Sequence, residues 1–277
     1  MSELFTVVGA QGFLGAALVQ QLKQDGHTVI QITRENWPEL GARLGHVIFA
    51  AGKTTQFAQR PIETVQSQTS LPASILADYN YSSFLYISST RVYRTANSTH
   101  EGATLSVAPG SSDEIYNLTK LTAECMCLAL ENPFVRVVRL ANIFAPFSNA
   151  NNFLASILND AARARHINFK SGPETEKDYV DLRVVLELLP KISLSGQKRL
   201  YNLASGQNTS HKQIAEKLEQ LGISTQFEPS ATIDKYLPID VSLLHSEFDV
   251  PNYQLIEELP HLLKHANQIA TDKGLKT

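Results

Sequence analysis

The stretch Gly9-Ala-Gln-Gly12-Phe-Leu-Gly15 decides the fold of this chain. It follows a short apolar run, Leu4–Val8, and it opens a segment whose apolar residues recur at helical spacing. Between a strand and a helix, three glycines at this spacing allow a tight turn, a close backbone approach to a pyrophosphate and close packing of the helix. The stretch therefore predicts a dinucleotide-binding turn, with cofactor contacts from Gly9, Gln11, Gly12, Phe13, Leu14 and Gly15.

Strand-like and helical segments alternate after this turn. Strands are predicted over residues 27–33, 46–50, 84–88 and 135–140, and helices over residues 13–23, 61–78 and 114–130. Pro72 should kink or end the second of these helices, because it lacks the amide hydrogen of a helical bond. Residues 35–45 leave room for only one abbreviated helical turn. The alternation predicts a Rossmann-type α/β fold, a doubly wound parallel sheet with helices on both faces.

The alternation weakens after Pro146. Helices are predicted there over residues 153–164, 182–189 and 210–221, with two more up to residue 269, and extended segments over residues 177–180, 200–204 and 225–228. We therefore expect a dinucleotide-binding domain with the catalytic residues over residues 1–146. A smaller α/β substrate-binding subdomain is expected over residues 147–277. We expect the two to be partly interleaved, because no low-complexity linker separates them.

Composition narrows the class of protein. The 277 residues are 43% hydrophobic and 18% charged with a net charge of −3, which is typical of a globular protein. No basic stripe indicates a nucleic-acid partner, and no apolar run approaches the roughly 20 residues that span a membrane. The N-terminus lacks the features of a signal peptide, so we expect a cytoplasmic location. Cys125 and Cys127 do not have metal-ligand spacing, and His261 and His265, four residues apart, have no acidic third ligand at an obvious spacing, so no metal is expected.

The end of the second predicted strand bears on the choice of cofactor. Sites that prefer NAD place an acidic residue there, which accepts hydrogen bonds from the ribose. In this chain Thr33 is followed by Arg34, with no carboxylate before Glu35. A guanidinium suits a 2′-phosphate through paired, charge-assisted hydrogen bonds. NADP is therefore favoured over NAD, the alternative being that Arg34 is a plain surface arginine.

A second pattern, Tyr116-Asn-Leu-Thr-Lys120, lies in a predicted helix, where residues four apart share a face. An ammonium beside a phenol lowers the pKa of the phenol, so that the tyrosine can exchange protons with a hydroxyl or carbonyl. The preceding strand ends in ISSTRVY (residues 87–93), and the carboxyl end of a parallel strand is where such folds place their sites. A Ser or Thr hydroxyl there can hydrogen-bond the reacting oxygen.

At these residues the chain resembles the extended short-chain dehydrogenase/reductases, specifically the NAD(P)-dependent sugar epimerase/dehydratase family. The resemblance covers almost the whole chain. It takes in the segments GAQGFLG (9–15), FAAGK (49–53), ISSTRVY (87–93), YNLTK (116–120), RLANIFAP (139–146), KDYVD (177–181), YNLASG (201–206) and IDVS (239–242).

The resemblance implies roles for individual residues. Ser89 matches the family's catalytic hydroxyl, with Ser88 and Thr90 as neighbours that could be mistaken for it. Tyr116 matches the general acid/base, and Lys120 the residue that holds the ribose and tunes the tyrosine. Further cofactor contacts are implied for Ala50, Ala51, Gly52, Tyr116 and Lys120. Substrate contacts are implied for Lys53, Thr90, Asn142 and Lys177, although Lys53 fits a plain surface lysine equally well.

Departures from the family bear on the reaction. Its 4,6-dehydratases have an Asp-Glu pair directly after the catalytic hydroxyl, whereas Thr90-Arg91 follows Ser89 here, so dehydration is not expected. Lys177 stands where many relatives have an arginine, and it cannot make the same bidentate contact. The leading hypothesis is an epimerase or ketoreductase that combines hydride transfer with proton transfer by Tyr116. By resemblance, its substrate is a nucleotide-linked sugar.

Two other functions stay open. A non-catalytic NADP-binding regulator or assembly factor has the same fold, but such relatives typically lose the tyrosine or the lysine that this chain retains. A flavonoid- or steroid-type reductase requires an apolar substrate cleft, on which the sequence is silent. Residues 62–76 and the Tyr116 helix are rich in small and apolar residues. This composition is typical of a homodimer interface, and equally of a helix that packs only on its own sheet.

Overall fold

The structure, a computed structural model, describes residues 2–146, 152–272 and 274. Internal contacts divide the chain into two compact units, each assembled from separate stretches of sequence. The first comprises residues 1–140, 183–203 and 242–250, and the second comprises residues 141–182, 204–241 and 251–277. This division differs from a single boundary at residue 146, because residues 141–146 belong to the second unit and two later stretches return to the first.

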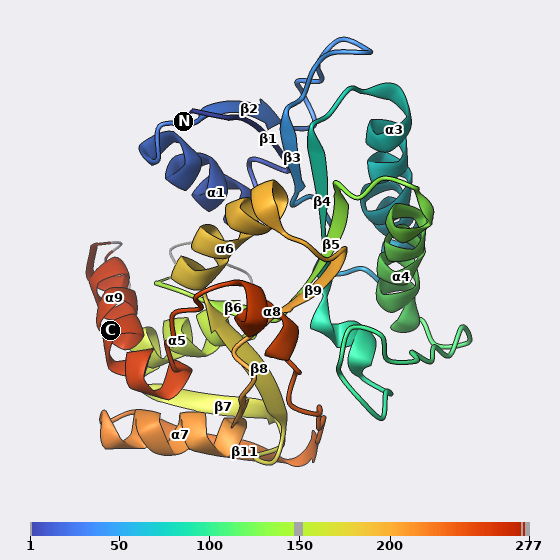
Figure 1. The fold of residues 1–277 in the computed structure, drawn as a ribbon. Helices are drawn as coiled ribbons and strands as arrows, with labels where there is room; N and C mark the ends of the chain where they lie inside the picture. Colours follow the sequence, from blue (N-terminus) through green and yellow to red (C-terminus); the bar gives the residue numbers. More distant parts are fainter. Residues whose placement is uncertain (1, 147–151, 273, 275–277) are drawn as a thin grey trace. The chain divides into compact units, whose positions relative to one another are not determined.

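A six-stranded parallel sheet forms the centre of the first unit (Figure 1). Its strand order is β2 (Thr28–Ile32), β1 (Leu4–Val8), β3 (His46–Phe49), β4 (Ser83–Ser89), β5 (Val135–Leu140) and β9 (Leu200–Leu203). Every neighbouring pair is parallel. The chain passes from β1 outward to β2 and then returns to the other side of β1 at β3. The carboxyl edge at β1 is therefore a switch point, where sheets of this kind bind ligands.

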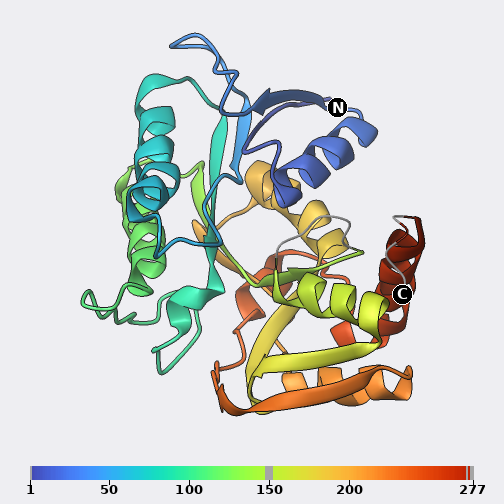
Figure 2. The same ribbon diagram turned by 180° about the vertical axis from the view of Figure 1, so that it is seen from behind.

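Helices cover both faces of this sheet (Figures 1 and 2). On one face lie α1 (Phe13–Gln24) and α6 (Leu182–Ser195), and on the other lie α3 (Leu71–Asp78) and α4 (Glu114–Ala129). A short helix, α8 (Ser242–Glu247), contacts β9. Buried side chains of β3, β4 and β5 pack with Ile75, Ala123 and Cys127 of the second helical layer. The prediction of a doubly wound, Rossmann-type α/β sheet is confirmed.

The predicted helix over residues 61–78 is continuous, so Pro72 does not end it. It consists of α2 (Pro61–Val65), a π-helical turn η1 (Gln66–Ser70) and α3. Because Pro72 has no amide hydrogen, the carbonyl of Gln68, four residues earlier, lacks its α-helical donor. The irregularity associated with Pro72 is therefore a π turn one turn earlier, a feature found often at functional sites.

Residues 35–45, which leave room for only one abbreviated helical turn, contain no helix. Side-chain hydrogen bonds hold this connection instead. The Asn36 amide oxygen accepts from the Thr33 amide at 2.8 Å, and its amide nitrogen donates to the Gln31 carbonyl at 2.8 Å. An asparagine that bonds nearby backbone groups competes with helix formation.

The described part of the second unit contains small sheets and helices (Figure 2). One sheet has the order β10 (Asn208–Ser210), β8 (Glu176–Asp181) and β6 (Asn142–Phe144), and another pairs β11 (Ser224–Thr232) with β7 (His166–Ser171). The helices are α5 (Phe153–Ala164), α7 (His211–Gln220) and α9 (Leu255–Asp272), whose apolar side chains form one core with Ile167 and Phe169. Strand β7 was not predicted, although its alternation of buried and exposed residues is the signal of a half-buried strand.

No helix within the described ranges has both the length and the apolar character that a membrane crossing requires.

Candidate active site

The glycine turn joins β1 to α1 in the first unit. Gly9 has φ +86°, a left-handed conformation that glycine adopts without strain, and a Cβ atom there would lie 2.8 Å from the Ala51 backbone. A Cβ atom on Gly15 would lie 2.1 Å from the Gly9 carbonyl oxygen. Only glycine at positions 9 and 15 therefore allows the turn to lie this close to the first residues of α1 and to the residues that follow β3.

The N-terminus of α1 has the features of an anion site. Gly12 precedes the helix, no side chain caps its end, and its first turn contains no acidic residue. The positive end of the helix dipole is therefore not balanced by a carboxylate of that turn. A phosphate group suits such an end, because backbone amides and the dipole both favour negative charge. Gly9, Gln11, Gly12, Phe13, Leu14 and Gly15 thus fit the pyrophosphate of a dinucleotide.

Two further segments that are predicted to contact the cofactor lie at the carboxyl ends of β3 and β2. Ala50, Ala51 and Gly52 follow β3, and a Cβ atom on Gly52 would lie 3.6 Å from the Lys120 Nζ. Gly52 therefore lies against the candidate catalytic lysine. Arg34 follows β2 and is exposed, and no ion pair engages its guanidinium in the part of the chain that the structure describes.

Ser89, Tyr116 and Lys120 come together at the carboxyl end of β4. Ser89 is the last residue of the strand, and its side chain hydrogen-bonds the hydroxyl of Tyr116. Tyr116 and Lys120 are both buried on one face of α4. The Lys120 ammonium donates to the Ile87 carbonyl at 2.8 Å and lies 6.0 Å from the centre of the Tyr116 ring. A phenol, a hydroxyl and an ammonium are thus gathered beside Gly52.

Burial shifts the pKa values of both residues on α4. It raises the pKa of the Tyr116 phenol, against the lowering effects of the Ser89 hydrogen bond and of the nearby charge of Arg91. Burial lowers the pKa of Lys120 to about 7, against the raising effect of Glu124. The charge of Lys120 is therefore variable near neutral pH, as a group that exchanges or relays protons requires.

The neighbours of Ser89 have different surroundings. The Ser88 hydroxyl is buried and donates a short hydrogen bond to Glu124, so Glu124 rather than Tyr116 is its partner. The Thr90 side chain is also buried. Of the serine pair, Ser89 is the one whose hydroxyl meets Tyr116.

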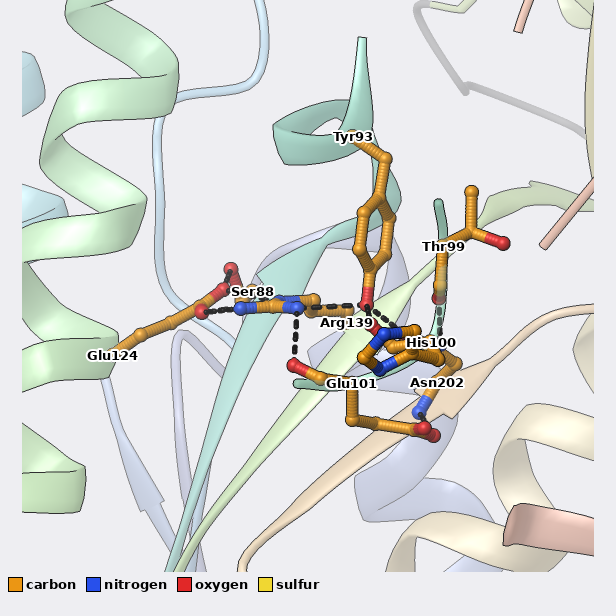
Figure 3. Close-up of polar contacts among 8 residues, drawn as sticks. All are labelled: Ser88, Tyr93, Thr99, His100, Glu101, Glu124, Arg139 and Asn202. Atoms are coloured by element: carbon orange, nitrogen blue, oxygen red, sulfur yellow. Dashed lines mark hydrogen bonds and ion pairs between the residues drawn. The ribbon is translucent and has the colours of Figure 1, made fainter. Parts of the chain in front are cut away.

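A buried polar network supports this end of the sheet (Figure 3). The Arg139 guanidinium on β5 donates to Glu124 on α4 at 2.6 Å and to the Tyr93 hydroxyl at 2.7 Å. Tyr93, on the 3-10 turn η2 (Thr90–Tyr93), donates in turn to the Asn202 side chain on β9 at 2.9 Å. The Asn202 amide nitrogen donates to the Thr99 carbonyl at 2.7 Å. The network therefore holds the backbone on both sides of Ser89 to α4, β5 and β9.

Gln68, in the π turn, was not singled out by the sequence. It is fully buried, donates to the Lys53 carbonyl at 2.7 Å and accepts from the Thr119 hydroxyl at 3.0 Å. It thereby joins the segment after β3 to the turn of α4 that carries Lys120. Nothing in the local sequence distinguishes Gln68 from its polar neighbours, because its role depends on contacts far apart in the chain.

The predicted substrate residues are distributed over both units. Lys53, in the first unit, donates to Glu63 of α2 at 2.5 Å, an ion pair that occupies its ammonium. Asn142 and Lys177 belong to the second unit, on β6 and β8. The Asn142 side chain donates to the Asp178 carbonyl at 2.9 Å, so it ties these two strands together. Substrate contacts by these residues and by Thr90 stay predictions.

Comparisons with known proteins agree with this architecture. Residues 5–204 match the model of the NAD dependent epimerase/dehydratase family. No curated protein matches the sequence. Among solved structures, RMD from Pseudomonas aeruginosa complexed with NADPH is 22% identical, with a TM-score of 0.78 over 96% of this chain and 99% of the other.

Two further solved structures illustrate the range of reactions. UDP-glucuronic acid 4-epimerase from Bacillus cereus, in complex with UDP-glucuronic acid and NAD, is 16% identical, with a TM-score of 0.75 over 96% of this chain and 99% of the other. dTDP-glucose 4,6-dehydratase from Bacillus anthracis, in complex with NAD, is 14% identical, with a TM-score of 0.76 over 99% of this chain and 100% of the other. At these identities the likeness concerns the fold alone.

The family model matches most of the chain, and the matched residues include the parallel sheet, the glycine turn and the helix of Tyr116 and Lys120. The chain belongs to the NAD dependent epimerase/dehydratase family. It is accordingly an enzyme.

Proposed function

We propose that the protein is an NADP(H)-dependent epimerase or ketoreductase that acts on the hydroxyl or ketone of a nucleotide-linked sugar. The observation that carries this proposal is the convergence of Ser89, Tyr116 and Lys120 beside Gly52. The Ser89 hydroxyl is hydrogen-bonded to the Tyr116 phenol, and the Lys120 ammonium lies on the same helix face as that phenol. Such a group of side chains is suited to transferring one proton to or from an alcohol or carbonyl oxygen.

Each of these residues has a distinct role in the proposed reaction. Tyr116 takes the proton from the substrate hydroxyl, or returns it to the carbonyl oxygen. Ser89 donates a hydrogen bond to that oxygen and stabilises the negative charge that develops on it. The Lys120 ammonium favours the phenolate of Tyr116. The Gly9–Gly15 turn and residues 50–52 would hold the dinucleotide cofactor, whose nicotinamide would supply the acceptance and donation of hydride.

The two residues after Ser89 favour epimerisation or ketone reduction over dehydration. Elimination of water requires an acid and a base beside the reacting carbons. Thr90 and Arg91 supply no carboxylate at this point of the chain. Solved relatives include both an epimerase and a dehydratase, so the residues of this chain carry the distinction.

Product analysis tests the reaction. The enzyme is incubated with NADPH, or with NADP⁺, and a panel of nucleotide sugars and their 4-keto forms. Reduction appears as stoichiometric loss of NADPH absorbance with one reduced sugar, and epimerisation as a new sugar isomer with no net loss. Formation of a dehydrated keto-sugar would contradict the proposal. Tight cofactor binding without turnover of any sugar in the panel would favour a non-catalytic role.

Arg34 is the basis for proposing NADP rather than NAD. Its guanidinium is exposed after β2, and the chain has no carboxylate at positions 33 or 34 to accept ribose hydroxyls. Calorimetric titration of the Arg34→Gln variant tests this role. Its affinity for NADPH should fall about tenfold or more, since hydrogen bonds to charged groups contribute about 1.5–3 kcal/mol. Its affinity for NADH should not change, and Arg43→Gln, at another exposed arginine of the unit, should alter neither.

A homodimer and a cytoplasmic location complete the proposal. Ile62 on α2 is 70% exposed, an apolar side chain available for contact with a second copy. Light scattering after size exclusion should give the mass of a dimer, and Ile62→Glu should shift it toward the monomer. A monomeric wild-type protein would contradict the dimer.

A further inference from the structure

Arg91 occupies a notable position relative to Tyr116. It follows Ser89 by two residues on η2, and its guanidinium carbon lies 5.6 Å from the centre of the Tyr116 ring and 4.9 Å from that of Phe57. The two rings are themselves 5.1 Å apart. The guanidinium therefore lies against a pair of aromatic rings, one of which is the candidate acid–base, at a distance typical of cation–π contacts.

Within the part of the chain that the structure describes, the charge of Arg91 has no carboxylate partner. Among residues 2–146, 152–272 and 274, no acidic side chain forms an ion pair with it, and its Nε atom is buried without a hydrogen-bond acceptor. A buried donor without an acceptor is destabilising, so its retention requires a reason. An arginine also keeps its proton at all pH values relevant to a protein. Tyr116 thus faces a permanent, unneutralised positive charge.

The other groups around Tyr116 do not supply such a charge. Lys120 lies 6.0 Å from the ring centre, but its pKa of about 7 makes its charge variable, and Glu124 acts upon it from the next turn of α4. Ser89 and Tyr86, which also interact with Tyr116, are neutral. Glu124 is itself paired with Arg139. Arg91 is therefore the constant cation of this cluster.

We propose that Arg91 is a positioning residue whose guanidinium stabilises the phenolate of Tyr116 and keeps the tyrosine ready to exchange protons whatever the protonation state of Lys120. In the sequence Arg91 is visible only as the absence of an acidic residue after Ser89. The contact with the Tyr116 ring gives that position a function of its own. Use of this charge in turnover rests on the proposed function, whereas its effect on Tyr116 does not.

The test is a direct titration of Tyr116, which needs no substrate. Fluorotyrosine, whose phenol ionises at lower pH than that of tyrosine, is incorporated throughout, and ¹⁹F NMR follows each ring with pH. The Tyr116 signal is the one that Tyr116→Phe removes. In Arg91→Gln its pKa should rise by about one unit or more, since an opposite charge at about 4–6 Å shifts a pKa by 1–3 units.

Arg91→Lys and Arg43→Gln serve as controls. Arg91→Lys keeps the charge, so the pKa of Tyr116 should rise less than in Arg91→Gln, and Arg43→Gln should leave it unchanged. An unchanged Tyr116 pKa in Arg91→Gln would overturn the proposal, as would equal rises in Arg91→Lys and Arg91→Gln. If Arg91→Gln does not fold, Arg91→Met is titrated under the same criteria. A shifted titration in a protein without turnover would leave this inference standing and count against the proposed function alone.

Discussion

The hydroxyl of Tyr86 donates a hydrogen bond of 2.8 Å to the carbonyl of Gln68. Pro72 leaves this carbonyl without its α-helical donor, so a side chain of the sheet satisfies a backbone group of the covering helix. The same tyrosine ring lies 4.9 Å from the Lys120 Nζ. Tyr86 thus contacts both the π turn and the candidate catalytic lysine.

Replacement of Tyr86 by phenylalanine should lower the free energy of unfolding by about 1–2 kcal/mol, because a buried carbonyl loses its donor. Urea denaturation measures the loss. In a Pro72→Ala background, the restored amide of residue 72 can donate to Gln68, so the same replacement should cost less. Equal losses in both backgrounds would show that Pro72 and Tyr86 are not linked through this carbonyl.

The buried ion pair of Arg139 and Glu124 should be costly to break. Both side chains are at most 5% exposed, so Glu124→Gln leaves a guanidinium buried without its counter-charge. We expect a loss of about 3–5 kcal/mol in the free energy of unfolding. Glu187→Gln, in the exposed pair with Lys191, should cost less than about 0.5 kcal/mol. Similar losses in the two variants would argue against the importance of burial.

The approach of α1 to the glycine turn predicts a large effect of Gly15→Ala. The added Cβ atom would lie 2.1 Å from the Gly9 carbonyl oxygen, so the turn must move and its amides lose their positions. Isothermal titration should show NADPH affinity reduced by at least about tenfold, the equivalent of 1.4 kcal/mol. Gly110→Ala, where a Cβ atom meets nothing within 4 Å, should bind as the wild type does. Unchanged affinity in Gly15→Ala would place the cofactor elsewhere.

Lys120 should make stability depend on pH in a defined direction. Its pKa is lowered to about 7 in the folded chain, whereas an unfolded lysine titrates near pH 10.4. Between these values the unfolded chain binds the extra proton, so the free energy of unfolding should rise with pH by up to about 1.4 kcal/mol per unit. The free energy of unfolding, measured by denaturation at each pH, should therefore rise from pH 7 to 10 in the wild type relative to Lys120→Met. The same pH dependence of the free energy of unfolding in both proteins would mean that the pKa of Lys120 is not lowered.

The sequence predicted what depends on local pattern. Hydrophobic periodicity and the residues that end a helix or strand correctly placed two strands, Leu4–Val8 and residues 135–140, and the glycine turn between the first strand and its helix. Ser89, Tyr116 and Lys120 converge because parallel strands end at one edge and helix residues four apart share a face. Their catalytic roles stay predictions, as do those of the cofactor and substrate residues.

Other features depend on contacts between distant residues, which local pattern does not reveal. The link from Gln68 to Lys53 and Thr119, and the pairing of Glu124 with Arg139, join segments far apart in the sequence. The sequence shows Arg91 only as a departure from an acidic pair, because its contact with the Tyr116 ring depends on the fold. Strand β7 was not predicted, although its residues alternate between exposed and buried.

The most direct test of the account compares wild type with Tyr116→Phe on the nucleotide sugar that turns over in the panel. The rate of turnover and the dissociation constant for NADPH are measured side by side. Loss of the phenol hydroxyl should reduce kcat by about 100-fold or more, since a positioned acid–base contributes about 10²–10⁴, with cofactor affinity little changed. Full turnover by Tyr116→Phe would contradict the assignment of Tyr116 as the proton-transferring group.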